Sequence, residues 1–246
     1  MMSLAIAALI FVAAVIYSSV GHAGASGYIA VMALFGVAPS VMKPTALCLN
    51  ILVATFGTWR LHTAGWVAWS ALWPYLLGSV PLAFVGGAIQ LPGTSYRVVV
   101  GLVLLIASAR LLIDPHERTK TPDGPAPRPS LMVAPIIGAV IGLLSGLTGT
   151  GGGIFLSPVL LFMGWAGARQ SAGITSPFIL VNSIAGLAGN WLSLASVPVE
   201  LPVYAIAALG GAFLGTQMAI KWFSATLLQR ALAVVLIVAG LKLILT

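Results

Sequence analysis

Two glycine-rich segments are the places where this chain could bind a ligand. The first covers residues 21–27, and the second covers residues 145–153, with the sequence Ser-Gly-Leu-Thr-Gly-Thr-Gly-Gly-Gly. Glycine runs disfavour a continuous helix and leave backbone N–H groups free at the start of the next helix. Free amides at the positive end of a helix dipole attract anions. The alternative is close helix packing through small residues, which is common in membrane proteins.

These two glycine-rich segments, the first break (21–27) and the second break (145–153), lie in equivalent positions of a duplicated sequence. Glycines 21, 24 and 27 pair with glycines 146, 149 and 152. Neither run ends in the Gly-Lys-Ser/Thr of a P-loop, which argues against a nucleotide site of that type. The predicted ligand-binding residues of the breaks are Gly24, Ser26, Gly149, Thr150, Gly151, Gly152 and Gly153.

Asn50 and Asn182 occupy equivalent positions in two later apolar segments. Residues 50–59 and 182–191 share an Asn, a Gly and a Trp in register. An amide in hydrocarbon is costly unless it is paired, so each Asn either makes a helix–helix hydrogen bond or faces a ligand. Three hydroxyl residues lie five to seven positions earlier, about two helical turns away, and could share that face: Thr45, Thr175 and Ser176. Nearby prolines at 44 and 177 remove backbone hydrogen bonds.

Three residues that can carry a positive charge lie near the Asn-containing segments or in the first break. Lys43 and Arg169 precede the two Asn-containing helices, where they could anchor the helices at the interface by snorkelling or attract an anion. His22 lies in the first break and is the one histidine predicted near the bilayer interior. It could pack, bind an anion or carry a proton.

The four acids lie outside the predicted spans. Asp114, Glu117 and Asp123 are in a polar linker, and Glu200 is in a loop. Transporters of cations and protons usually keep a carboxylate inside the membrane. This chain offers an anion amides, hydroxyls and nearby bases, so we predict a small anionic substrate. If transport is coupled to protons, either His22 or the substrate carries them.

The composition identifies an integral membrane protein. Hydrophobic residues are 60% of the 246 residues and charged residues 6%, and mean hydropathy is +1.10, which exceeds what a soluble domain buries. The net charge of +7 comes from scattered basic residues, which indicates anchoring rather than nucleic-acid binding. With one cysteine, Cys48, and scattered histidines, we expect no disulfide, no metal, no cofactor and no enzymatic activity.

We predict an all-α polytopic protein with two homologous four-element halves, residues 1–113 and 131–246, joined by a polar linker, 114–130. Each half begins with a broken or re-entrant helix pair, which counts as one element and whose second member is short. The apolar segments of the first half are 4–20, 28–37, 40–62, 67–90 and 95–113. Those of the second half are 131–144, 154–165, 170–193, 201–222 and 226–245. The first segment has no basic residue ahead of it, so we expect it to be retained as a membrane segment.

The basic residues favour inverted halves. With the linker in the cytoplasm and inverted halves, eight basic residues are cytoplasmic (Arg60, Arg110, Arg118, Lys120, Arg128, Arg169, Lys221 and Arg230) and three are not (Lys43, Arg97 and Lys242). Parallel halves would give six against five, which is no bias. The positive-inside rule therefore favours halves of opposite orientation.

The chain resembles the TauE/SafE family of sulfite exporters and anion permeases. The resemblance rests on Gly149-Thr150-Gly151-Gly152-Gly153-Ile154 followed by Pro158, on residues 172–176 (Ala-Gly-Ile-Thr-Ser), and on the duplication with short broken helices. The first half departs from the pattern, with Lys43-Pro44-Thr45-Ala46 where the family has a Gly-Thr-Ser type sequence. The resemblance implies export, or less often uptake, of sulfite, a sulfonate or a similar anion.

We therefore predict a secondary transporter of a small anion that works by alternating access in the bacterial cytoplasmic membrane. Its expected partners are the anion and the lipid bilayer, with no nucleic acid; a homodimer is left open. An anion channel would use the same residues and is the main alternative. A membrane-embedded subunit of a larger complex is a weaker one.

Overall fold

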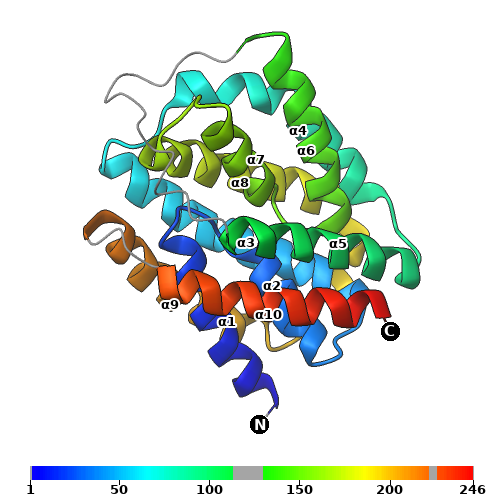
Figure 1. Cartoon of the computed structure of the whole chain (residues 1–246). Coiled ribbons are helices and arrows are strands. Elements are labelled where there is room, and N and C mark those ends of the chain that lie inside the picture. The colour runs from blue at the N-terminus through cyan, green and yellow to red at the C-terminus, as the bar shows by residue number, and fades with distance from the viewer. Residues whose placement is uncertain (1, 113–129, 222–225, 246) are drawn as a thin grey trace.

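The computed structural model describes residues 2–112, 130–221 and 226–245, and the elements within these ranges are helices (Figure 1). The first half contains α1 (Met2–Ser18), α2 (Ala25–Leu34), α3 (Pro39–Thr63), α4 (Trp69–Ala88) and α5 (Gly93–Leu112). The second half contains α6 (Val133–Thr148), α7 (Gly153–Phe162), α8 (Ala168–Gly189), α9 (Leu201–Lys221) and α10 (Thr226–Leu245). A short 3₁₀ helix, η2 (Trp191–Ser196), follows α8.

This architecture confirms the predicted all-α polytopic class. Among the described residues, four helical segments are long and apolar enough to cross a bilayer: Pro39–Thr63, Trp69–Ala88, Arg169–Gly189 and Leu201–Ile220. The helices α2 and α7 each have 10 residues, about 15 Å or half a hydrocarbon core. Most of the predicted linker lies outside the described residues.

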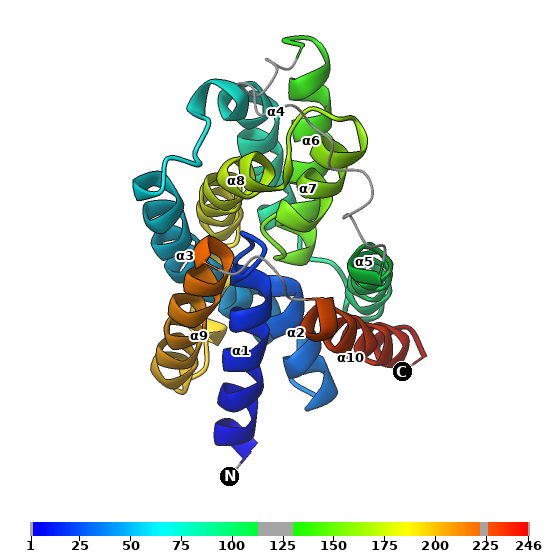
Figure 2. The same ribbon diagram turned by 60° about the vertical axis from the view of Figure 1, so that its left-hand side comes forward.

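The first helix of each half packs in parallel against the fourth helix of the other half (Figures 1 and 2). Glycines make both contacts close. A Cβ on Gly142 of α6 would lie 2.2 Å from the Ser79 carbonyl oxygen of α4. A Cβ on Gly215 of α9 would lie 2.3 Å from the Val15 carbonyl oxygen of α1. Small residues at these positions let the backbones touch, as is typical of helix pairs in membranes.

The equivalent helices α3 and α8 run antiparallel to each other, and α5 packs against its equivalent α10. In α3 and α8, Asn50 contacts Ser183 and Thr58 contacts Ser176, so residue numbers rise along one helix as they fall along the other. In α5 and α10, which lie side by side in Figure 1, a Cβ on Gly101 would lie 2.8 Å from the Gly240 carbonyl oxygen. The pairs α3–α8 and α5–α10 each join one helix from either half.

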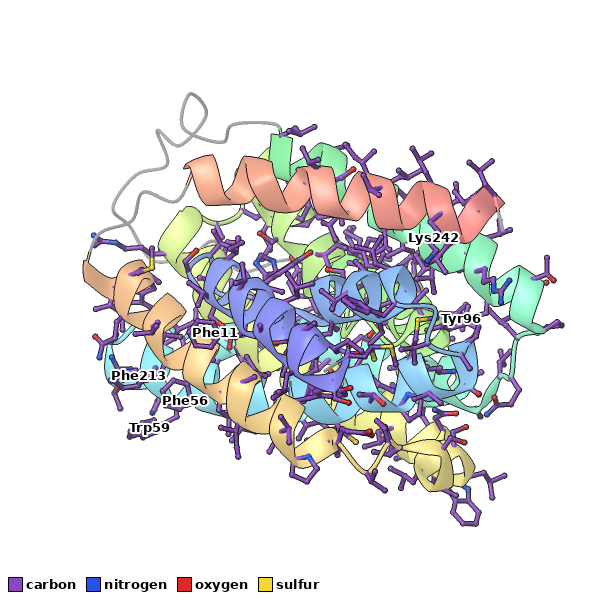
Figure 3. The ribbon with its side chains drawn as sticks, turned by 90° about the horizontal axis from the view of Figure 1, so that it is seen from below. Phe11, Phe56, Trp59, Tyr96, Phe213 and Lys242 are labelled. Atoms are coloured by element: carbon purple, nitrogen blue, oxygen red, sulfur yellow. The ribbon has the colours of Figure 1, made fainter. Side chains whose placement is uncertain are left out.

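The outer surface carries many large apolar side chains, which suits a lipid environment. Trp59 is 59% exposed and Phe213 is 48% exposed. With Phe56 they form an aromatic group over α3 and α9 (Figure 3), with ring centroids 5.9 Å apart for Phe56 and Trp59 and 6.3 Å apart for Phe56 and Phe213.

The helix bounds differ from the sequence prediction mainly at the breaks. Residues 145–148 and 25–27 are helical, so the breaks are shorter than the glycine patterns suggested. Gly24 and Gly152 are the residues immediately before α2 and α7. They are structural equivalents, whereas the sequence alignment paired Gly24 with Gly149. Gly146 belongs to the helix because its lack of a side chain serves packing: a Cβ there would lie 2.1 Å from the Ala83 carbonyl oxygen.

Candidate substrate-binding site

The break between α6 and α7 is a backbone turn that only glycine accommodates without strain. Gly149, Gly151 and Gly152 have φ values of 82°, 76° and 82°, in the left-handed region where a side chain is unfavourable. The chain therefore leaves α6 and enters α7 within four residues, 149–152. The free N–H groups of the first turn of α7 lie at this buried position.

Gly151 also lets the break approach α3 and α8. A Cβ on Gly151 would lie 2.5 Å from Asn50 Nδ2 and 2.9 Å from Ser183 Oγ. Because the glycine has no side chain, these two polar groups reach the backbone of the break. The approach brings one residue from each half next to the turn.

Asn50 joins the two halves at this point. Its Nδ2 donates to the Thr150 carbonyl oxygen and to Ser183 Oγ, both at 3.3 Å. The amide orientation follows from the first bond, because a carbonyl oxygen can only accept. Asn50 Oδ1 is buried and has no hydrogen-bond partner among the described residues. Both N–H groups of this amide are thus used to hold the break and Ser183 in place, and its oxygen remains available only to a hydrogen-bond donor.

Hydroxyl groups complete the polar cluster around the break. Thr150 Oγ1 lies 2.9 Å from Thr148 Oγ1, and Thr148 Oγ1 donates to the Leu144 carbonyl oxygen at 2.7 Å. Tyr96 of α5 donates its hydroxyl to the Thr148 carbonyl oxygen at 3.1 Å. Thr148 and Thr150 are 0% and 3% exposed, so these groups lie in the protein interior.

His22 connects the first break to the second. Its Nε2 lies 3.1 Å from the Gly153 carbonyl oxygen, and a Cβ on Gly153 would lie 3.1 Å from His22 Cδ2. Since the carbonyl only accepts, Nε2 carries the proton in this contact. The predicted position of His22 in the interior is thus next to the start of α7, where an anion would be favoured.

Two tyrosines from the helices on either side, Tyr17 of α1 and Tyr28 of α2, pack against the first break. Ser26 donates to the hydroxyl of Tyr17, and the Tyr28 hydroxyl donates to the Ala23 carbonyl oxygen. A Cβ on Gly24 would lie 2.9 Å from the Tyr28 ring. Gly24 and Ser26 therefore face aromatic side chains rather than the polar cluster at the second break.

The other predicted polar residues of α3 and α8 do not form hydrogen bonds with the cluster. Asn182 Nδ2 donates to the Phe178 carbonyl oxygen of its own helix at 2.8 Å. Thr175 donates to the Ser171 carbonyl oxygen, also in α8, at 2.8 Å. Ser176 pairs with Thr58, two helical turns from the Asn50–Ser183 contact. Thr45 is buried, and its hydroxyl has no partner among the described residues.

Lys43 is buried beside the break but its charge is directed to α4. The side chain is 6% exposed, and Nζ donates to the carbonyl oxygens of Gly86, Gly87 and Ile89 at 3.3, 3.0 and 3.3 Å. These carbonyls end α4, where a cation is favoured by the helix dipole. A Cβ on Gly149 would lie 3.2 Å from Lys43 Cγ, so the Lys43 stem packs on the break.

Lys43→Met is therefore expected to lower the thermal stability of the purified protein by several degrees. The thioether keeps the stem but leaves three helix-terminal carbonyls without their donor, at a cost of about 1–3 kcal/mol. Lys242→Met is the control, because Lys242 is exposed and donates to the Leu34 carbonyl oxygen at 2.9 Å. Equal melting temperatures for Lys43→Met and the wild type would contradict the capping role.

Arg169 lies at the surface, away from the cluster. It is exposed, and its guanidinium carbon lies 5.5 Å from the centroid of the Trp66 ring. This is a cation–π contact at the start of α8. The arrangement matches the interface-anchoring alternative.

Three residues of the cluster were not among the sequence-predicted site residues: Thr148, Ser183 and Tyr96. Ser183 follows Asn182 in the duplicated motif, and Thr148 is in the glycine-rich segment, so both carried a signal in the repeat. Nothing in the sequence marked Tyr96 as a site residue, because its contact with Thr148 depends on how α5 packs against the other half.

Sequence comparisons place the chain among known proteins. Residues 6–243 match the sequence model of the family described as sulfite exporter TauE/SafE. The chain belongs to the TauE/SafE family. This TauE/SafE protein is also 40% identical over 242 residues to a protein of Sinorhizobium fredii (strain NBRC 101917 / NGR234) named probable membrane transporter protein y4hK, with 98% of each chain covered. No solved structure matches it.

These matches confirm the family predicted from the second break. They also agree with a multi-pass protein of the cell membrane, since the described helices include four candidate spans. Both matches are to transport proteins rather than to enzymes, as the sequence predicted for this TauE/SafE chain.

Proposed function

We propose that the protein is a secondary transporter that moves a small anion across the membrane by alternating access, with sulfite or a related sulfur-containing or organic anion as substrate. Family membership and the relative named as a probable membrane transporter support the transport role. The main structural support for this proposal is the buried break at the start of α7, where Asn50 of one half contacts Thr150 of the other.

The chemistry of this site suits a negatively charged ligand. The first turn of α7 offers backbone N–H groups and the positive end of a helix dipole, and Ser183, which accepts from Asn50, can donate its hydroxyl proton to a ligand. Unwound backbone at membrane depth is tolerated where it is buried in protein or lines a cavity. Sulfite and sulfonates present several oxygen acceptors to such donors.

The arrangement of the halves supports alternating access. Inverted repeats place a site near the bilayer centre between two broken helices. The antiparallel course of α3 against α8, and the contacts of Asn50 and His22 across the halves, support such an inverted arrangement. Rocking one half against the other would change these contacts. A proton could accompany the anion on His22 or on the substrate.

Asn50→Ala is expected to reduce anion uptake about tenfold, because it leaves the Thr150 carbonyl of the break and the Ser183 hydroxyl without the amide that holds them, at a cost of about 1–3 kcal/mol. The measurement is sulfite or sulfonate flux in proteoliposomes with matched protein content. The control is Thr55→Ala on the same helix, because Thr55 is exposed and donates to its own helix at Ile51. Wild-type flux in Asn50→Ala would remove this residue from the site.

Counterflow separates the carrier from an anion channel. Proteoliposomes loaded with unlabelled anion should transiently accumulate labelled anion against its gradient, because a carrier exchanges substrate across the membrane. A channel gives no such accumulation. Equilibration without overshoot would therefore favour the channel.

A further inference from the structure

Four buried oxygen atoms lie at the junction of α4, α6 and α8 and make no hydrogen bond with the polar cluster of the break. They belong to Tyr75 and Ser79 on α4, Ser145 on α6 and Asn182 on α8, side chains that are at most 1% exposed. Tyr75 Oη, Ser79 Oγ, Ser145 Oγ and Asn182 Oδ1 have no hydrogen-bond partner among the described residues. Buried polar atoms are normally paired, so a group of four points to a ligand.

The register of α4 and α6 brings Ser79 beside the α6 stripe of small residues. A Cβ on Gly142 would lie 2.2 Å from the Ser79 carbonyl oxygen and 2.6 Å from Ser79 Cα. One turn later, a Cβ on Gly146 would lie 2.1 Å from the Ala83 carbonyl oxygen. The two helices are therefore parallel and in backbone contact at the level of Ser79.

The helix α8 joins this pair in the same direction. A Cβ on Gly173 would lie 1.9 Å from the Trp66 carbonyl oxygen. Further along α8, one on Gly186 would lie 3.6 Å from Gly146 Cα and 3.7 Å from the Ala83 carbonyl oxygen. One helical turn before this level, α8 carries Asn182 and α4 carries Ser79.

Tyr75 and Ser145 lie one turn to either side of this level. Tyr75 is one turn before Ser79 and belongs to the same core cluster as Ile141 and Phe178. Ser145 is in the last turn of α6, and a Cβ on Gly152 would lie 3.4 Å from its Cβ and 2.9 Å from Phe178 Cε1. The four oxygens thus come from one three-helix junction.

We propose that this junction, formed by Tyr75, Ser79, Ser145 and Asn182, is a binding site for a monovalent cation, with Na⁺ as the test ion. The ligand set is oxygen only, which suits a hard cation. Its members are neutral, which suits a single rather than a double positive charge. Asn182 Nδ2 is held by the Phe178 carbonyl, so this residue offers the junction only its oxygen.

The position of the junction also favours a cation. Ser145 lies at the C-terminal end of α6, the negative end of that helix dipole. The proposed anion lies across the break, at the N-terminal and positive end of α7. Opposite charges at the two ends of one break would stabilise each other, and cation and anion would bind cooperatively. This cooperativity rests on the proposed function, whereas the cation site itself does not.

The test is the thermal stability of the purified full-length protein in sodium, potassium and choline chloride at equal ionic strength. Saturating Na⁺ should raise the apparent melting temperature by roughly 4 °C or more over choline. Tyr75→Phe and Ser79→Ala each delete one unpartnered oxygen and little volume, so both should remain folded in choline and lose most of the Na⁺-dependent rise. The matched control is Ser108→Ala on α5, whose hydroxyl is buried but donates to the Leu105 carbonyl at 2.7 Å.

Two results would overturn the site. Equal melting temperatures in the three salts would mean that the junction holds water only. An unchanged Na⁺ response in Tyr75→Phe and Ser79→Ala would place the cation elsewhere; if either variant does not fold, Ser145→Ala takes its place. Sulfite-induced stabilisation, measured in choline, tests the anion site separately. A protein that responds to sulfite but not to Na⁺ would therefore retain the proposed function and lose the cation site.

Discussion

Gly151→Ala is expected to abolish anion transport while leaving the protein in the membrane. Gly151 has a φ of 76°, and a Cβ there would lie 2.5 Å from Asn50 Nδ2, 2.8 Å from Ile179 Cγ2 and 2.9 Å from Ser183 Oγ. The methyl group would push Asn50 and Ser183 from the break in addition to straining the backbone. Because the proposed donors are displaced together, we expect proteoliposome flux to fall to background.

Gly36→Ala separates the two effects of this substitution. Gly36 has a φ of 73°, and a Cβ there would meet no atom within 4 Å. It therefore carries the same conformational cost, about 1–2 kcal/mol, without the clash. Flux near the wild-type level in Gly36→Ala and background flux in Gly151→Ala would assign the loss to the site. Substantial flux in Gly151→Ala would show that the break does not hold the substrate.

Gly142→Ala is expected to have a large effect on folding. The added methyl group would lie 2.2 Å from the Ser79 carbonyl oxygen and within 2.7 Å of the Ser79 carbonyl carbon. Backbone atoms cannot rotate away as a flexible side chain can, so α4 and α6 must separate. Overpacking of this kind costs about 1–3 kcal/mol or more, and the yield of monodisperse protein in detergent should fall sharply.

The matched control lies in the equivalent helix pair, α1 and α9. A Cβ on Gly210 would lie 3.5 Å from Phe11 Cε2, an ordinary van der Waals contact. Gly210→Ala should therefore purify and melt like the wild type, as measured by size-exclusion chromatography and thermal unfolding. If Gly142→Ala behaved in the same way, the close approach of α4 to α6 would not be required for stability.

The helices could be predicted from the sequence because apolar runs and glycine breaks are local signals. The extent of the breaks could not, because glycine has two uses that look alike in a sequence. Gly151 turns the chain, with a φ of 76°. Gly146 stays helical and admits the backbone of α4. Only the neighbouring helix distinguishes the two.

The candidate site was predictable in part for the same reason. Asn50 and Asn182 hold matching positions in the repeat, yet Asn50 reaches the other half whereas Asn182 donates within α8. Lys43 was expected either to anchor a helix at the interface or to attract an anion, but it donates to three carbonyls at the end of α4. Which acceptor comes close to a side chain depends on tertiary packing, which residue spacing does not encode.

The exchange of partners between the halves has a consequence for how the protein is made. The helix α1 packs against α9, and α4 packs against α6. During synthesis the ribosome must therefore extend the chain to Lys221, the end of α9, before the first helix to emerge can meet its partner. Until then the face of α1 that packs on α9 contacts lipid or the insertion machinery, whereas α4 waits only for α6, which ends at Thr148. A chain truncated after the first half would lack both partner helices.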